Sequence, residues 1–142
     1  MGAFEQIRAI RHPFLLTLER VEVVGEDLAM VMELADCQLL DRYRECYTAG
    51  GGGVPREELL GYMREAAEAL DTMGAKYGLQ HLDVKPENIF LVAGHAKVGD
   101  YGLVRRANRG GEQTRGGFTP KYTAPEVLMG GVDIRSDQYR LA

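Results

Sequence analysis

A polar loop in the second half of the chain carries the residues best suited to chemistry. Asp83, Lys85 and Asn88 lie within six positions, and Asp100 follows a short distance downstream. A carboxylate, an ammonium and a carboxamide are costly to bury without partners. Asp83, Asn88 and Asp100 offer the oxygen ligands that Mg²⁺ prefers, and Lys85 could neutralise a phosphate. The set suggests phosphoryl transfer, although an ordinary polar loop explains this segment alone equally well.

A β-hairpin is expected to position this loop. The apolar residues 89–92 predict a strand, Gly94-His95 a turn, and residues 96–98 a short returning strand. The loop at residues 80–88 would therefore open into the hairpin, and Asp100 would follow its second strand. This arrangement could bring the polar side chains together.

Helices are expected upstream of the loop. Residues 39–47 predict a short helix that stops at the flexible linker Gly50–Gly53. Pro55 suits the first turn of a longer helix, whose N-terminal dipole Glu57 and Glu58 favour. An apolar stripe at steps of four and three indicates a helix packed on a core. Its members are Leu59, Met63, Ala66, Leu70 and Met73.

The N-terminal third predicts a helix followed by a second hairpin. Phe4, Ile7 and Ile10 recur at a helical period, and Pro13 ends that helix. Strands are expected from Leu16 to Val23 and from Leu28 to Leu34, around a turn at residues 25–27. Residues 103–123 show no period, and the chain reaches another helix at its end.

Composition limits the class of protein. The 142 residues suffice for one domain, and 45% of them are hydrophobic, which is typical of a globular protein. The net charge of −4 argues against a nucleic-acid partner. We find neither a signal peptide nor an apolar run of the roughly 20 residues that a membrane helix needs. Cys37 and Cys46 lack metal-ligand spacing and favour two reduced thiols in a cytoplasmic domain; a membrane anchor elsewhere in a parent protein stays open.

The order of four short segments resembles the protein kinase family. HLDVKPEN at 81–88 resembles the catalytic loop H-R-D-L-x-x-x-N, and Asp100-Tyr101-Gly102 resembles D-F-G. Ala124-Pro125-Glu126 matches A-P-E, and Ser136-Asp137 resembles the start of the following large helix. The resemblance covers nearly the whole chain and points to a eukaryotic-type serine/threonine protein kinase catalytic domain. Together with HLDVKPEN, the segment His12-Pro13-Phe14 resembles bacterial rather than animal members of this family.

The resemblance implies an α+β, protein-kinase-like two-lobed fold in truncated form. Residues 1–34 would be the end of the small lobe and residues 35–142 the first half of the helical large lobe, with the hinge at Met30–Ala35 between them. The implied activity transfers the γ-phosphoryl of ATP, with Mg²⁺, to serine or threonine hydroxyls of a protein substrate. No glycine-rich strand or V-A-I-K-type lysine precedes Pro13, and Gly50–Gly53 lacks the strand context to replace them. We therefore expect this chain alone to be incomplete and inactive.

The resemblance assigns the catalytic roles. Asp83 would orient the attacking hydroxyl, and Asn88 and Asp100 would hold Mg²⁺. Lys85, at the position typical of serine/threonine kinases, would stabilise the transferring phosphoryl group. Thr119 would support Asp83 through its hydroxyl.

The resemblance also implies an adenine site at the hinge. Met32 would be the gatekeeper beside the base. Backbone groups of Glu33 and Ala35 would bond its edge, and Phe90 would supply an apolar floor beneath it. Without the resemblance, this stretch is better interpreted as a plain buried strand.

Other residues are expected to act through structure. His81 would join an apolar stack with Tyr101, Leu18 and Ile7, as a packed core histidine rather than a general base. Asp137 would hold the backbone of the catalytic loop.

One replacement bears on regulation. Leu82 stands where the family has an arginine that neutralises a phosphorylated activation loop. We hypothesise that phosphorylation of that loop, for which Thr114 is the plausible site, is not the main switch.

Two other functions compete with a protein kinase. A non-catalytic pseudokinase or scaffold gains from the missing lysine, but Asp83, Asn88 and Asp100 are all intact. A small-molecule phosphotransferase of similar fold is disfavoured by Thr119 and the A-P-E segment, which would build a peptide platform.

Overall fold

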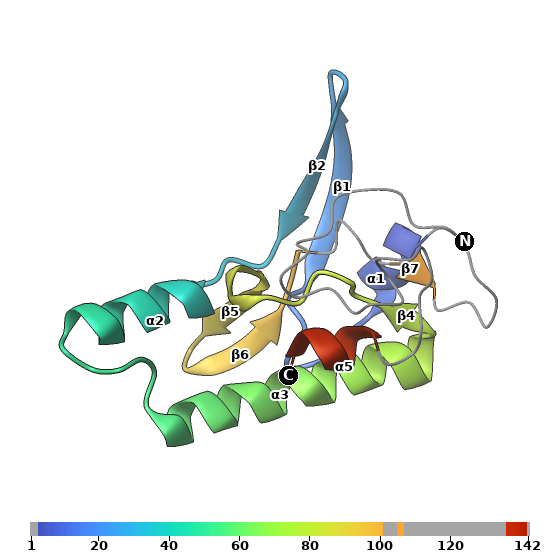
Figure 1. Cartoon of the computed structure of the whole chain (residues 1–142). Coiled ribbons are helices and arrows are strands. Elements are labelled where there is room, and N and C mark those ends of the chain that lie inside the picture. The colour runs from blue at the N-terminus through green and yellow to red at the C-terminus, as the bar shows by residue number, and fades with distance from the viewer. Residues whose placement is uncertain (1–2, 101–104, 107–135, 142) are drawn as a thin grey trace.

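The structure of the chain is a computed structural model that describes residues 3–100, 105–106 and 136–141 (Figure 1). Helices and strands are mixed along the chain, so the α+β class predicted from the sequence is confirmed. The helices are α1 (Ala3–Ala9), α2 (Leu39–Thr48), α3 (Arg56–Tyr77), the 3-10 turn η1 (Pro86–Asn88) and α5 (Ser136–Leu141). The strands are β1 (Leu18–Val24), β2 (Asp27–Met32), β3 (Cys37–Gln38), β4 (Leu79–Gln80), β5 (Ile89–Val92), β6 (His95–Val98) and β7 (Arg105–Arg106).

The N-terminal hairpin forms as the sequence predicts. Strands β1 and β2 pair antiparallel from Leu18↔Met32 to Val24↔Asp27. Gly25 supplies the left-handed backbone of the turn, with φ of 67°. The buried Leu18 fixes the foot of the hairpin, whereas Val23 is 75% exposed near the tip. Figure 1 shows the hairpin standing away from α2 and α3.

The second hairpin lies directly after the polar loop. Strand β5 is the centre of a three-stranded sheet in the order β3-β5-β6. The turn falls one residue earlier than expected, at Ala93-Gly94, because His95 pairs with Val92 as part of β6. Both turn residues have positive φ, 51° and 80°, as a tight two-residue hairpin requires.

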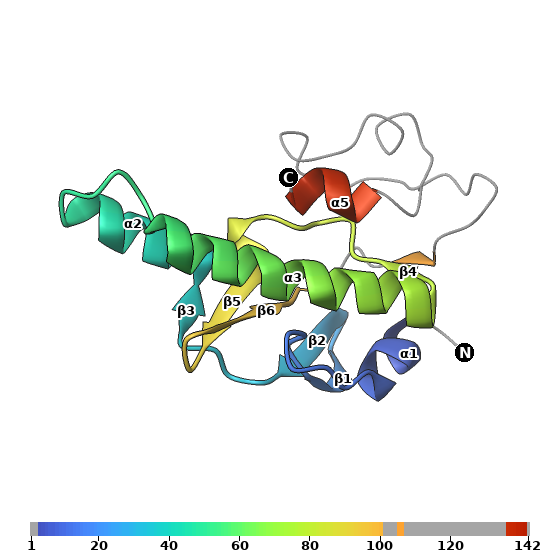
Figure 2. The same ribbon diagram turned by 90° about the horizontal axis from the view of Figure 1, so that it is seen from below.

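Helix α3 is the longest of the described elements, with 22 residues, five of which are buried in the core. It ends at Gly78, whose φ of 64° is left-handed and whose N–H bonds the carbonyls of the last turn. Figure 2 shows β1, β2, β3 and β6 on one side of α3 and α5 on the other. Helix α3 contacts β4, β6 and α5.

The buried face of α3 differs from the predicted stripe at its N-terminal end. Leu59 is exposed and Met63 only half-buried, whereas Tyr62 is buried. Tyr62 tolerates burial because its hydroxyl donates a hydrogen bond to Glu58 Oε1 at 2.8 Å. The core-facing residues of the helix are Tyr62, Ala66, Ala69, Leu70 and Met73.

One hydrophobic core joins the two parts of the chain. It takes Ile7 and Ile10 from the N-terminal helix region and Leu18 from β1. Strands β5 and β6 contribute alternate residues, as expected of strands with one buried face. Helix α1 ends at Ala9, slightly before the expected stop at Pro13, and Ile10 still bonds the carbonyl of Ile7.

Several predicted segments fall beyond the described residues. Tyr101, Thr114, Thr119 and the A-P-E segment at 124–126 all lie there. The helix expected at the end of the chain is α5. Within residues 3–100, 105–106 and 136–141, no helix has the length and apolar character to cross a membrane.

Candidate active site

Three of the predicted catalytic side chains meet in the loop before β5. Asp83 and Asn88 are both buried, at 8% and 3% exposure. Asn88 Nδ2 donates to Asp83 Oδ2 at 3.0 Å and to the Asp83 carbonyl at 2.8 Å. Lys85 Nζ lies 3.7 Å from Asp83 Oδ2. The 3-10 turn η1 produces this convergence because it folds Asn88 back over Asp83, with Asn88 N–H bonded to the Lys85 carbonyl at 2.9 Å.

Asp137 holds the backbone of this loop from the other end of the chain, as predicted. Its two carboxylate oxygens accept hydrogen bonds from His81 N–H at 2.5 Å and Leu82 N–H at 2.7 Å. Asp137 is 4% exposed, and hydrogen bonds to a buried carboxylate are among the stronger ones in proteins. These two hydrogen bonds, which we call the Asp137 clamp, fix Leu82 at φ of 67°. This is a left-handed conformation that a leucine adopts only at a cost in free energy.

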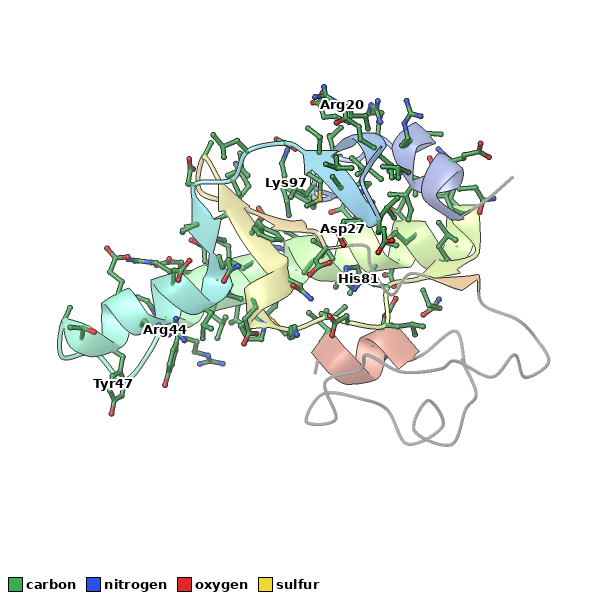
Figure 3. All side chains as sticks on the ribbon, turned by 90° about the horizontal axis from the view of Figure 1, so that it is seen from above. Arg20, Asp27, Arg44, Tyr47, His81 and Lys97 are labelled. Atoms are coloured by element: carbon green, nitrogen blue, oxygen red, sulfur yellow. The ribbon has the colours of Figure 1, made fainter. Side chains whose placement is uncertain are left out.

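His81 links the loop to the residue before Asp100. Asp83 N–H donates to His81 Nδ1 at 3.2 Å, so the proton of the neutral ring sits on Nε2 and bonds the Gly99 carbonyl at 2.6 Å. The ring is fully buried, and Figure 3 shows it near the middle of the molecule, over α3. The prediction of a packed, hydrogen-bonded core histidine is confirmed.

Asp100 is tethered to the same loop through its neighbour. Gly99 N–H bonds the Asn88 carbonyl at 2.9 Å, and Asp100 itself has a positive φ of 56°. The donor set suits Mg²⁺: both hydrogen bonds of the Asn88 amide come from Nδ2, which leaves Oδ1 as a cation ligand, and Asp100 adds a carboxylate. Mg²⁺ commonly takes one or two protein carboxylates and completes its shell with phosphates and water.

The predicted hinge residues line one cavity. Its volume is about 370 Å³, within the usual range for small-molecule sites. Met32, Glu33, Ala35 and Phe90, the four residues expected around an adenine, all lie on its wall. The remaining lining residues are Leu16, Leu34, Cys37 and Gln38.

The side chain of Glu33 braces the cavity wall. Its Oε1 accepts a hydrogen bond from Lys97 Nζ at 2.6 Å, and its Oε2 accepts one from Thr17 N–H at 3.2 Å. Burial alone would raise the pKa of Glu33, but these hydrogen bonds outweigh it and hold the pKa below 4.5. Because Glu33 N–H also bonds the Thr17 carbonyl, the Glu33 carbonyl is the backbone group left for a ligand.

The sequence prediction omitted half of the cavity wall. Cys37 and Gln38 form the two-residue strand β3, which pairs with Leu91 and Phe90 of β5 and is too short to show a period. Leu16 reaches the cavity because its N–H bonds the Val98 carbonyl, a contact between distant segments. Burial raises the pKa of the Cys37 thiol, which favours the protonated and unreactive form.

A larger hollow of about 490 Å³ lies between α3 and α5. Its polar lining includes Asp71, Gln80 and Asp137. The Asp137 carboxylate already binds the loop backbone, so this hollow brings none of the predicted catalytic side chains together.

Comparison with known proteins agrees with these features. The family model described as "Protein kinase domain" matches residues 4–141. The chain is 31% identical over 123 residues to Cyclin-dependent kinase F-3 of Oryza sativa subsp. japonica, covering 87% of this chain and 27% of that protein. It is 31% identical over 144 residues to Serine/threonine-protein kinase Pkn1 of Myxococcus xanthus, covering 95% and 20%. It is 29% identical over 125 residues to the Carbon catabolite-derepressing protein kinase of Candida tropicalis, covering 87% and 19%.

The chain thus spans about a fifth to a quarter of the length of these relatives. The match nevertheless runs through both the small-lobe hairpin and the catalytic loop, which agrees with the truncated two-lobed fold predicted above. The chain belongs to the protein kinase family.

Proposed function

We propose that this chain carries the phosphoryl-transfer centre of a serine/threonine protein kinase. The observation that carries the proposal is the contact of Asp83, Lys85 and Asn88 beside a cavity lined by the hinge. The names of the relatives support the serine/threonine class, as does Lys85 at its position in the loop.

Asp83 would receive the substrate hydroxyl. Its carboxylate is fixed by the amide of Asn88, and its backbone N–H by His81. A carboxylate held in this way can orient a hydroxyl and accept its proton as the oxygen attacks phosphorus. Lys85, close to the same carboxylate, would neutralise charge on the transferring phosphoryl group.

Asn88 and Asp100 would hold Mg²⁺, and the cavity would hold the adenine of ATP. When bound, Mg²⁺ would supply positive charge that neutralises the phosphates. The Asn88–Gly99 hydrogen bond keeps the two ligand residues in fixed register. At the cavity, Met32 and Phe90 would contact the base, while backbone groups of Glu33 and Ala35 would bond its edge.

Transfer of label from γ-labelled ATP tests the proposal. A longer protein that contains this chain, its Asp83→Asn variant and the exposed control Asp71→Asn would be assayed with peptides that offer serine, threonine or tyrosine, and with an aminoglycoside. We expect label on serine and threonine with the wild type and the control, and a loss of about 100-fold or more with Asp83→Asn.

Other outcomes would contradict the proposal. Label on the aminoglycoside alone would favour a small-molecule phosphotransferase. Binding of ATP with no transfer to any acceptor would favour the non-catalytic scaffold.

A further inference from the structure

Gly99, the residue before Asp100, lies directly against the floor of the hinge cavity. A Cβ atom at this position would lie 2.8 Å from both Cδ2 and Cε2 of Phe90. It would also lie 3.0 Å from Cδ2 of Leu16, which lines the same cavity. Contacts of 2.8 Å between carbon atoms are far inside their optimal separation. The ring of Phe90 therefore occupies space that exists only because residue 99 has no side chain.

The glycine is required for space and not for backbone conformation. The φ angle of Gly99 lies outside the left-handed region, unlike those of Gly25, Gly78 and Gly94. An alanine could adopt the same backbone, so any effect of Gly99→Ala must arise from contacts of the added methyl group.

The surroundings prevent the backbone from yielding. Gly99 is held on both sides of its Cα atom: its N–H donates to the Asn88 carbonyl, and its carbonyl accepts a hydrogen bond from His81 Nε2. Phe90 sits on the central strand, paired with Gln38 on one side and Lys97 on the other. Because both backbones are fixed, an added methyl group would have to displace the Phe90 ring.

We propose that Gly99 and Phe90 form a matched pair that sets the base specificity of the nucleotide site, an inference that rests on the proposed function. The missing side chain at 99 lets an aromatic ring lie as the cavity floor. An aromatic face stacks on a base, and a purine offers it a larger face than a pyrimidine. Gly99 acts as a positioning residue, and Phe90 as the residue that touches the base.

A double-mutant cycle tests the pair. The dissociation constants of ADP and CDP, with Mg²⁺, would be measured by calorimetry for five proteins. These are the wild type, Gly99→Ala, Phe90→Leu, the double variant, and Gly52→Ala. Gly52 is the matched control, because a Cβ there meets nothing within 4 Å and its φ is not left-handed.

We expect the effect of Gly99→Ala on ADP affinity to depend on the residue at position 90. Gly99→Ala should weaken ADP binding roughly tenfold or more, since overpacking pushes the ring out of place. In the Phe90→Leu background, the same substitution should change ADP affinity by less than about twofold, because leucine lacks the Cε2 atom and its Cδ atoms can rotate away from the methyl group, which a rigid ring cannot do. Phe90→Leu should also reduce the preference for ADP over CDP. Gly52→Ala should match the wild type.

Each contrary outcome has a distinct meaning. Unchanged ADP affinity in Gly99→Ala would overturn the pairing, as would an equal loss in the wild-type and Phe90→Leu backgrounds. An unchanged preference for ADP in Phe90→Leu would overturn the stacking. Absence of ADP binding by the folded wild type would contradict the proposed function itself. If Gly99→Ala does not fold, recovery of folding and binding in the double variant supports the pair, and failure to recover overturns it.

Discussion

The catalytic loop and the β1–β2 hairpin are held in place in contrasting ways. The loop at 80–88 is largely buried and is tied by polar contacts to segments outside it, through Asp137, His81 and Asn88. The hairpin is held by apolar packing at its foot, and its tip is exposed, as is Leu34 beyond it, at 90%. The groups expected to do chemistry are therefore fixed by buried polar contacts, whereas the tip of the hairpin is not.

Removal of the Asp137 carboxylate should have the largest effect. Asp137→Ala would leave the buried N–H groups of His81 and Leu82 without an acceptor and release the strained backbone at Leu82. The expected loss is about 3 kcal/mol in the free energy of unfolding, measured by urea denaturation. Asp71→Ala, at an exposed position of α3, should cost less than about 0.5 kcal/mol. Similar losses for the two variants would contradict the clamp.

Truncation of Leu18, at the foot of the hairpin, should have the second-largest effect on stability. Leu18 is 1% exposed, so Leu18→Ala should cost about 2–3 kcal/mol in the free energy of unfolding by leaving a cavity in the core. The variant tests whether the hairpin and the large-lobe part share one cooperative core. Two separate unfolding transitions in calorimetry, with only the first shifted by the substitution, would show that they do not.

The hydrogen bond from Lys97 to Glu33, which braces the cavity wall, should contribute less to stability, and its contribution should depend on pH. The Glu33 pKa is held below 4.5, so the brace stabilises the fold above pH 4.5 and is lost as pH falls through the lower folded value. Lys97→Met removes the hydrogen bond and should cost about 1 kcal/mol at pH 7. Thermal melting between pH 7 and pH 3 should then fall less steeply than for the wild type. Parallel profiles would mean that Lys97 does not hold Glu33 ionised.

Substitution at the hairpin tip should have the smallest effect. Val23→Thr keeps the β-branched shape of a residue that is 75% exposed. We expect a change in the unfolding free energy within about 0.5 kcal/mol. A loss of more than about 2 kcal/mol would show that the tip is packed in the folded protein, and the contrast between the two regions would fail.

The sequence predicts those parts of the molecule that depend on local patterns. The hairpins, α3 and the loop at 81–88 follow from alternation, helical period and a short motif. The face of α3 could not be predicted at its start, because burial of Tyr62 rather than Leu59 depends on the hydrogen bond to Glu58. The space that Gly99 leaves for Phe90 could not be predicted either, since it depends on how β5 and β6 pack.

The central claim is that the hinge cavity and the metal-binding loop form one nucleotide site, and ATP affinity measured with and without Mg²⁺ tests it most directly. We expect Mg²⁺ to raise the affinity of the wild type and of the control Asp27→Asn, whose carboxyl lies on the hairpin. Asp100→Asn should lose that rise while it keeps the Mg²⁺-independent binding supplied by the cavity. Mg²⁺ dependence of Asp100→Asn equal to that of the wild type would contradict the account.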